Sequence, residues 1–480
     1  MSDHSPTIQP GRDSFQDFLD GEGVALLDGA MGTMLYSRGA FIHRAFEELN
    51  VSEPGMVREI HAAYLAAGAD IIETNTFAAN RFRLSPHGLE KRVEELNRAG
   101  VARVREAAGG RAWIAGAMGP LGVRIEPFGA IGRDEAREVF RQQAAVLEDE
   151  AVDLFLLETF SHLPELLEAI AAIREVSQRP IVAEMRVTTG AVTPEGVDVA
   201  EVARAVELAG ANVVGVNCCE ALAALDALGE MHDSTSLPLV GQPNAGGPRS
   251  VGGRNLYLAS ADYLVAWGRR AVRNGARLLG GCCGTRPEHI RALREAVGQA
   301  HAPAANTRVR RAKTRPPAAP PVPLLEKSPL ATALSRGSFP LGVSFPPSRG
   351  HGSRDITRAA RQLKLAGVDF VSLPEGTGAR AHAPPIVLAG ACRQAGILPV
   401  VEYSCRGRRI ERIQSDLIGA SMLGVETLVL VTGDPLNPGA EQDAWPDLEI
   451  DSIGAMNLAV RLNHGEDIGG NAIGQPTAFH

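Results

Sequence analysis

The chain has 480 residues, which exceeds one ordinary hydrophobic core and predicts two domains. Hydrophobic residues make up 45% and charged residues 22%, as in soluble globular proteins. The net charge of -8 argues against a nucleic-acid partner, and we find neither a signal peptide nor an apolar run that could span a bilayer. We therefore expect a cytoplasmic protein with no nucleic-acid or membrane partner.

The first 300 residues alternate short apolar runs with amphipathic stretches, which is typical of β/α repeats. Eight runs predict strands, at 24–27, 70–72, 113–115, 153–157, 181–185, 213–216, 237–241 and 276–279. Eight repeats over roughly 290 residues fit one α/β fold, an eight-stranded parallel β/α (TIM) barrel. A doubly wound open sheet is the alternative.

Two of the intervening helices have ends that the sequence predicts. One should be capped at Ser52 and stop at Gly68, and another should start at Asp198 and stop at Gly210.

The pattern breaks near residue 301. Residues 301–325 are rich in Pro and Arg and predict an extended linker, and their basic run lacks the interleaved aromatics of a nucleic-acid patch. Four further runs, at 341–345, 368–373, 398–403 and 427–431, predict strands, followed by a helix at 451–462. Four strands in about 155 residues predict an incomplete second β/α barrel. We expect a disordered N-terminus at 1–14, a barrel at 15–300, the linker, and a half barrel at 326–480.

The cysteines carry the strongest chemical signal. Six cysteines, four of them in two adjacent pairs, do not form a disulfide framework. Cys218 follows one predicted strand, and Cys282 and Cys283 follow another between glycines. Because the carboxyl ends of barrel strands meet at one face, these three thiols should converge. Three thiolates with an open fourth position suit a catalytic Zn²⁺ that holds a substrate thiol. Reduced structural thiols are the alternative, and Cys219 should point away.

Polar residues at other strand ends are individually ambiguous. Asp28 either holds a substrate ammonium or caps a helix, and Gly29 lets the backbone approach a ligand closely. Glu158 closes the fourth predicted strand, as an amino-group binder or as a partner in an ion pair inside the barrel.

Together these motifs resemble the zinc-dependent homocysteine S-methyltransferase family. The resemblance covers residues 15–300 and rests on DGAMGT at 28–33, ETNTF at 73–77, GVNC at 215–218, PNAG at 243–246 and GGCCG at 280–284. It implies that Cys218, Cys282 and Cys283 bind zinc. It also implies that homocysteine is bound by four residues: Asp28, Gly29, Glu158 and Asn217. The implied reaction is methyl transfer to homocysteine to give methionine, from a small-molecule donor that the sequence leaves open. A non-catalytic zinc- or thiol-binding barrel is the rival hypothesis.

The C-terminal part resembles methylenetetrahydrofolate reductase, on FPP at 345–347, QSDLIGA at 414–420, TGDP at 432–435 and DSIG at 451–454. The resemblance implies that Asp434 lies beside flavin and folate, with FAD as a possible cofactor. The sequence departs from that family at Val343, where a glutamate is expected, and also at Glu402 and Arg409. We therefore expect an inactive module. The alternative is a bifunctional enzyme with a working FAD site, in which either Val343 does not occupy the position of the acid or another carboxylate such as Glu375 replaces it.

Overall fold

The computed structural model describes residues 14–41, 43–251, 254–297, 320–346, 353–376, 382–433 and 449–480. Contacts divide the chain into two compact units. The first comprises Met1–Gly122 and Arg133–Lys313, and the second comprises Val123–Gly132 and Thr314–His480. The predicted domain boundaries stay predictions, since residues 1–13 and 298–319 lie outside the described residues.

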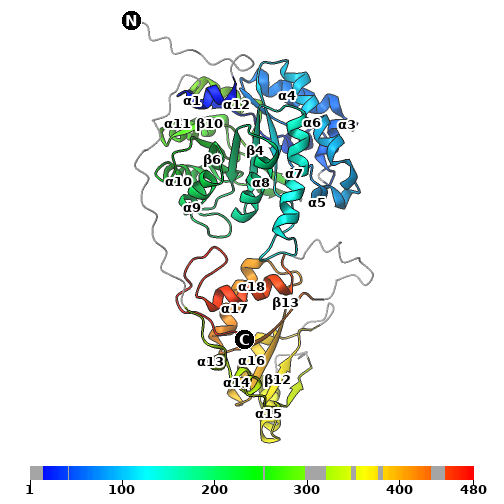
Figure 1. Cartoon of the computed structure of the whole chain (residues 1–480), viewed down its shortest axis with the longest axis vertical. Helices are drawn as coiled ribbons and strands as arrows, with labels where there is room; N and C mark the ends of the chain where they lie inside the picture. The colour runs from blue at the N-terminus through cyan, green and yellow to red at the C-terminus, as the bar shows by residue number, and fades with distance from the viewer. Residues whose placement is uncertain are drawn as a thin grey trace. The chain divides into compact units, whose positions relative to one another are not determined.

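The first unit is a parallel β/α barrel (Figure 1). Its eight described strands are β1 (Ala25–Leu26), β2 (Ile71–Glu73), β3 (Trp113–Met118), β4 (Leu154–Phe160), β5 (Ile181–Met185), β6 (Val213–Asn217), β7 (Leu239–Gln242) and β10 (Ala276–Leu279). They pair in the order β1-β10-β7-β6-β5-β4-β3-β2, and a parallel bridge between Leu27 and Ile71 joins the two ends. The predicted barrel is confirmed, and the open-sheet alternative is wrong.

Helices surround these strands. The longer ones are α4 (Pro54–Ala66), α6 (Val93–Ala108), α7 (Arg133–Asp149), α8 (Leu163–Val176), α9 (Val199–Leu208), α10 (Ala221–His232), α11 (Ala261–Arg273) and α12 (Pro287–Val297). Shorter ones are α1 (Phe15–Asp20), α2 (Gly32–Ser37), α3 (Leu49–Ser52) and α5 (Arg81–Leu84). A hairpin of β8 (Arg249–Val251) and β9 (Arg254–Leu256) was not predicted, because each strand has only one apolar residue.

Helix α9 begins as predicted, since the Asp198 side chain accepts a hydrogen bond from the Ala200 N–H at 2.7 Å. Gly210 and Gly68 follow the ends of α9 and α4 with φ of 91° and 96°, in the left-handed region that glycine favours.

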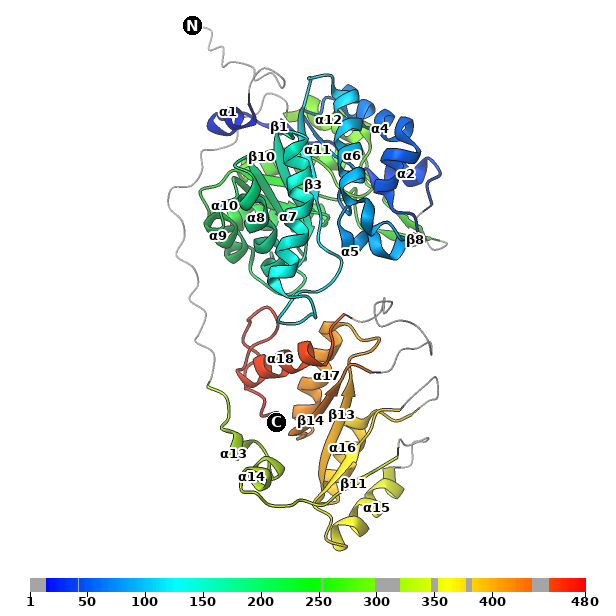
Figure 2. The same cartoon turned by 45° about the vertical axis from the view of Figure 1, so that its right-hand side comes forward.

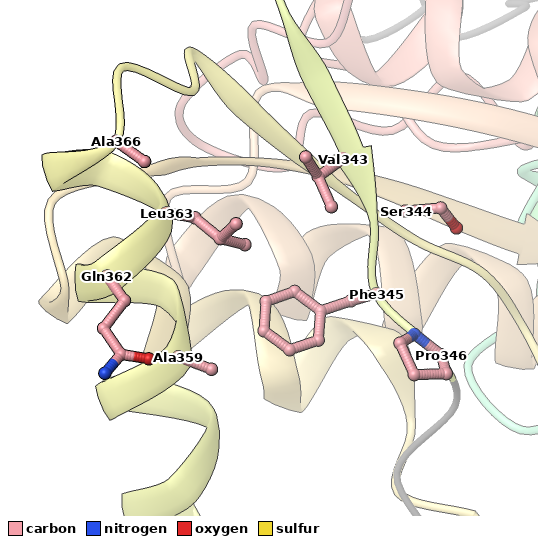
Figure 3. A pocket seen from close by; sticks show the side chains of 8 residues that line it. All are labelled: Val343, Ser344, Phe345, Pro346, Ala359, Gln362, Leu363 and Ala366. Atoms are coloured by element: carbon pink, nitrogen blue, oxygen red, sulfur yellow. The ribbon is translucent and has the colours of Figure 1, made fainter.

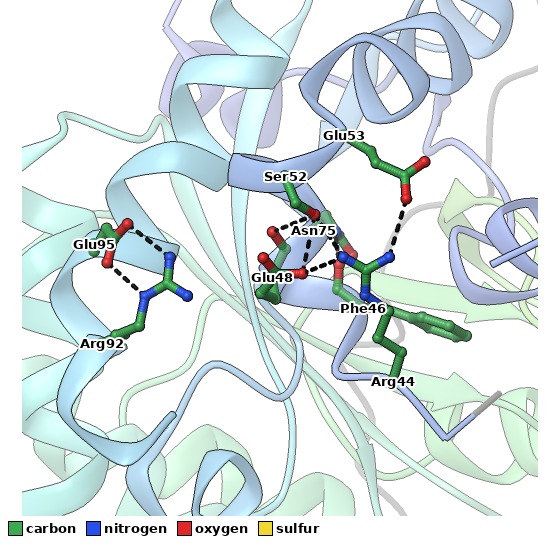
Figure 4. Close-up of polar contacts among 8 residues, drawn as sticks. All are labelled: Arg44, Phe46, Glu48, Ser52, Glu53, Asn75, Arg92 and Glu95. Carbon is green, nitrogen blue, oxygen red and sulfur yellow. Dashed lines mark hydrogen bonds and ion pairs between the residues drawn. The ribbon is translucent and has the colours of Figure 1, made fainter. Parts of the chain in front are cut away.

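The predicted cap at Ser52 is wrong. Helix α4 starts at Pro54, whose fixed φ and missing N–H suit the first helical position. Ser52 instead ends α3, and its hydroxyl lies 2.9 Å from the Glu48 carboxylate and accepts a hydrogen bond from Arg44 at 2.8 Å (Figure 4). The side chain that was expected to cap α4 therefore belongs to a surface ion-pair network.

Helix α1 packs into the barrel core at the amino-terminal end of the strands. Phe15 and Phe18 are buried with Trp113, and their ring centroids lie 5.4 and 5.5 Å from it. The Arg277 guanidinium donates hydrogen bonds to the carbonyl oxygens of Phe18, Leu19 and Gly23. These contacts leave the opposite, carboxyl end of the strands to build a site.

The second unit contains the parallel sheet β11-β12-β13-β14 (Figure 2). The described strands are β11 (Gly342–Ser344), β12 (Phe370–Leu373), β13 (Leu398–Ser404) and β14 (Thr427–Val431). The helices are α13 (Leu324–Lys327), α14 (Pro329–Ser335), α15 (Ser353–Leu365), α16 (Pro385–Gln394), α17 (Ile410–Met422) and α18 (Ser452–Asn463). The predicted incomplete barrel is confirmed. Phe128, from the Val123–Gly132 part of this unit, is buried in its core. Within the described residues, we find no helix that is both long and apolar enough to cross a membrane.

Candidate metal centre and substrate site

Cys218, Cys282 and Cys283 come together at the carboxyl end of the barrel strands. Cys218 directly follows β6, and the other two follow β10 after two glycines. Their sulfur atoms all lie within 4.8 Å of one another, and those of Cys218 and Cys283 are 3.9 Å apart. Among the described residues, no other group of His, Cys, Asp or Glu side chains is spaced to hold a metal ion. Cys219 is buried outside this group.

Local backbone bends make this convergence possible. Cys218 has a φ of 49° and Gly284 a φ of 81°, both in the left-handed region. A Cβ at Gly284 would lie 2.1 Å from the Cβ of Tyr257, so this position requires glycine. The chain therefore leaves the strand direction at both points, and adjacent cysteines can face one centre.

The pKa values of the thiols in this cluster are shifted in opposite directions. Hydrogen bonds from Cys218 and Cys282 lower the pKa of Cys283 to about 3, and one from the Tyr257 hydroxyl acts in the same direction. The pKa of Cys282 is raised, first by its hydrogen bond with Cys218. Three soft donors so close together fit a thiophilic divalent ion, which would favour the ionised form of all three.

Four carboxyl groups lie close enough to interact with one another at the barrel mouth: Asp28, Glu73, Glu158 and Glu184; Glu158 also interacts with Cys283. Burial is the first cause that raises the pKa of each, and for Glu73 the pKa reaches about 7. Mutual repulsion raises the pKa values of Asp28, Glu158 and Glu184 further. Within the described part of the chain, no Arg or Lys forms a salt bridge with any of the four. The mouth therefore carries potential negative charge that no described Arg or Lys neutralises through a salt bridge.

Several acceptor atoms at the mouth are buried and unpaired. Asp28 Oδ1, both carboxyl oxygens of Glu184 and Gln242 Oε1 have no hydrogen-bond partner among the described residues. Buried polar atoms are usually satisfied, so a set of unpaired acceptors indicates a site for a ligand that brings donors. A ligand with a positive charge and several N–H groups matches both the geometry and the charge.

The Asn217 side chain connects the carboxyl ends of β4 and β6 through hydrogen bonds. Its side-chain amide donates to Thr159 Oγ1 at 2.9 Å and to Glu158 Oε2 at 3.3 Å. Its Oδ1 accepts a hydrogen bond from the Thr159 N–H at 2.8 Å. The substrate contact predicted for Asn217 stays a prediction, as do those of Gly29, Asp28 and Glu158. A Cβ at Gly29 would lie 2.7 Å from Thr285 Oγ1, so this turn requires glycine for its own packing.

Glu184 and Tyr257 were not predicted as site residues from the sequence. Glu184 follows Val182 by two residues in a buried strand and therefore shares its inward face, a signal visible in the sequence alone. Gln242 donates to Glu73 Oε1 at 2.7 Å, across the barrel from β7 to β2. Tyr257 follows the unpredicted hairpin, so nothing local in the sequence placed it at the cluster.

In the second unit, Asp434 lies outside the described residues. Val343 lines a cavity of about 420 Å³ between β11 and α15, with Phe345 and Leu363 beside it (Figure 3). None of the described side chains that line the cavity is ionisable. Glu375 is held in an ion pair with Arg408 and accepts a hydrogen bond from the Ser404 N–H at 2.6 Å. The suggestion that Glu375 replaces the missing acid stays a prediction.

Fold and site together define a β/α-barrel protein with a thiol cluster at the carboxyl end of its strands. The chain belongs to the homocysteine S-methyltransferase family, whose model matches residues 25–297. Residues 336–472 match the model of methylenetetrahydrofolate reductase.

Individual relatives support this membership. The chain is 30% identical to a methionine synthase of Mycobacterium tuberculosis over 310 residues, which are 60% of this chain and 26% of that protein. It is 29% identical to S-methylmethionine–homocysteine S-methyltransferase BHMT2 of Pongo abelii, covering 61% of this chain and 83% of the relative. The metallated form of the homocysteine methyltransferase MmuM from Escherichia coli aligns with a TM-score of 0.51 and 26% identity, over 59% of this chain and 99% of that structure. The chain thus spans about a quarter of the length of the methionine synthase.

Proposed function

We propose that this chain transfers a methyl group to the thiol of L-homocysteine and forms L-methionine, with zinc held by Cys218, Cys282 and Cys283. One observation carries the proposal: three sulfur atoms within 4.8 Å of one another beside unpaired buried carboxyl oxygens. A ligand that joins a thiol to an ammonium group can engage both parts, and homocysteine is such a ligand.

The donor set fits zinc. Three thiolates leave the fourth tetrahedral position open, as in catalytic rather than structural zinc sites. Bound there, zinc would supply Lewis-acid chemistry that favours the ionised form of a substrate thiol at neutral pH.

The carboxyl groups would fix the other end of the substrate. Asp28 and Glu158 would accept hydrogen bonds from the ammonium group, whose charge favours their ionised forms. With both ends held, the sulfur has a defined direction toward the incoming donor. The reaction then forms a sulfur–methyl bond as the donor–methyl bond breaks, and the thiol proton leaves to solvent.

The methyl donor stays open. One relative is named for S-methylmethionine as its donor, whereas the name methionine synthase specifies no donor. We therefore propose a panel assay: zinc-loaded protein, homocysteine and one donor at a time, with methionine measured by mass spectrometry.

Two cysteine variants sharpen this assay. Cys282→Ala should abolish methionine formation and lower bound zinc, because one sulfur donor is lost. Cys219→Ala is the matched control, since Cys219 adjoins Cys218 but lies outside the cluster. Equal loss in both variants, or full activity in Cys282→Ala, would contradict the proposed metal centre.

We further infer that the second unit has no reductase activity. The motivation is Val343, which stands where the resembling family has a glutamate, in a cavity without ionisable lining side chains among the described residues. The purified chain should not oxidise NADH or NADPH in the presence of methylenetetrahydrofolate and added FAD. Folate-dependent oxidation above the background without protein would overturn this inference.

A further inference from the structure

Strand β4 contains an irregularity beside the candidate site. Leu157 pairs with Ala183 of β5, whereas the next pair along the two strands joins Phe160 to Met185. Between these pairs β4 advances three residues while β5 advances two. One extra residue is therefore accommodated at 158–159, as in a β-bulge, a device that re-aims side chains near functional sites.

The bulge changes which way the following residue faces. In regular alternation Glu158 and Phe160 would share one face of the strand. Instead, the Phe160 ring packs against Phe140 of α7, with centroids 5.9 Å apart, while Glu158 stays at the barrel mouth. Glu158 thus keeps the inward register of Leu154 and Leu156, and the extra residue turns Phe160 outward to the surrounding helices.

Thr159 adopts an unusual backbone conformation at this bulge. Its φ of 66° lies in the left-handed region, which a β-branched residue adopts only when its surroundings impose it. Asn217 provides that constraint, with one hydrogen bond from the Thr159 N–H and one to the Thr159 hydroxyl. Strained residues held in this way concentrate at functional sites.

We propose that Thr159 is a positioning residue of the substrate site: held by Asn217, it ends the inward register of β4 at Glu158 and keeps that carboxyl group directed toward the substrate ammonium. The inference rests on the proposed function, because it assumes that Glu158 binds homocysteine. Thr159 acts on the substrate only through Glu158. Its hydroxyl also hydrogen-bonds to that carboxyl group, which lowers the pKa of Glu158 against the larger effect of burial.

The test measures L-homocysteine binding to zinc-loaded protein by isothermal titration calorimetry. Thr159→Ala keeps the backbone N–H but loses the hydroxyl, and binding should weaken about ten-fold, as expected for one hydrogen bond to a charged group. Thr159→Ser retains the hydroxyl and should bind nearly as the wild type does. Zinc content should be unchanged in both variants.

A double-mutant cycle with Glu158→Gln separates positioning from general damage. If Thr159 acts through Glu158, adding Thr159→Ala to Glu158→Gln should cause less than a two-fold further loss of affinity. The matched control is Ala151→Gly, which removes another left-handed non-glycine residue at the far end of β4, with φ of 51°, and should leave binding unchanged.

The outcomes are distinguishable. Wild-type affinity in Thr159→Ala, or a full ten-fold additional loss in the Glu158→Gln background, would overturn the positioning role while the proposed function stands. Failure of the wild type to bind homocysteine, or unchanged affinity in Glu158→Gln alone, would instead contradict the proposed function itself.

Discussion

Replacing Glu73 by glutamine should remove a pH-dependent loss of stability from the barrel. Burial raises the pKa of Glu73 from 4.5 to about 7 in the folded chain. Above about pH 4.5 the unfolded chain releases this proton and the folded chain retains it, so the free energy of unfolding falls as pH rises. The loss is complete near pH 7, where the folded group also ionises. At 1.36 kcal/mol per unit, the shift corresponds to about 3 kcal/mol.

Glutamine preserves the shape and still accepts the 2.7 Å hydrogen bond from Gln242. It also removes the repulsion that Glu73 exerts on Asp28, Glu158 and Glu184. Glu73→Gln should therefore match the wild type near pH 4.5 and exceed it by about 3 kcal/mol at pH 8.

The assay is urea unfolding of metal-free protein, followed through the fluorescence of the buried Trp113 and Trp267 of the barrel. Glu59→Gln changes the net charge equally at an exposed site and serves as the control. Parallel pH profiles for the wild type and Glu73→Gln, or a wild type that gains stability relative to the variant as pH rises, would refute the reasoning.

Three other outcomes follow from the barrel. Asp28→Asn should raise the KM for homocysteine about ten-fold, because it weakens one charged hydrogen bond, and the zinc content should not change. A parallel loss of zinc would show instead that Asp28 supports the metal. Gly215→Ala should destabilise the barrel by about 3 kcal/mol or more in urea unfolding, because its Cβ would lie 1.8 Å from the Val240 carbonyl oxygen. Near-native stability would contradict the close approach of β6 and β7 at this position. Arg277→Ala should make the chain after α1 sensitive to limited proteolysis, because three hydrogen bonds to that segment are lost. An unchanged digestion pattern would show that the packing of Phe18 alone holds α1 in place.

The sequence predicted the barrel because its strands are buried and apolar, separated by helices with clear ends. It predicted the cap of α9 at Asp198 but not the start of α4, where Pro54 decided the boundary over Ser52. The β8–β9 hairpin was not predicted, because its short strands lack the alternation of apolar and polar residues.

The thiol cluster was foreseeable because strand ends in a barrel share one face, whatever their separation in the sequence. The bulge at Thr159 was not, since its cause is a hydrogen bond from β4 to Asn217 on β6, a tertiary contact without a local pattern. The sequence places Glu184 on the same face of its strand as Val182, so its inward direction could have been predicted. The sequence does not reveal that both carboxyl oxygens of Glu184 lack hydrogen-bond partners among the described residues.

The most direct test is a zinc titration of metal-free protein, with the initial rate of methionine formation from homocysteine and the best donor of the panel as readout. Our proposal predicts no turnover without metal, a linear rise with added zinc, and a plateau at one zinc per chain. Full turnover in the metal-free protein, or no methionine at one equivalent of zinc with any donor, would contradict it.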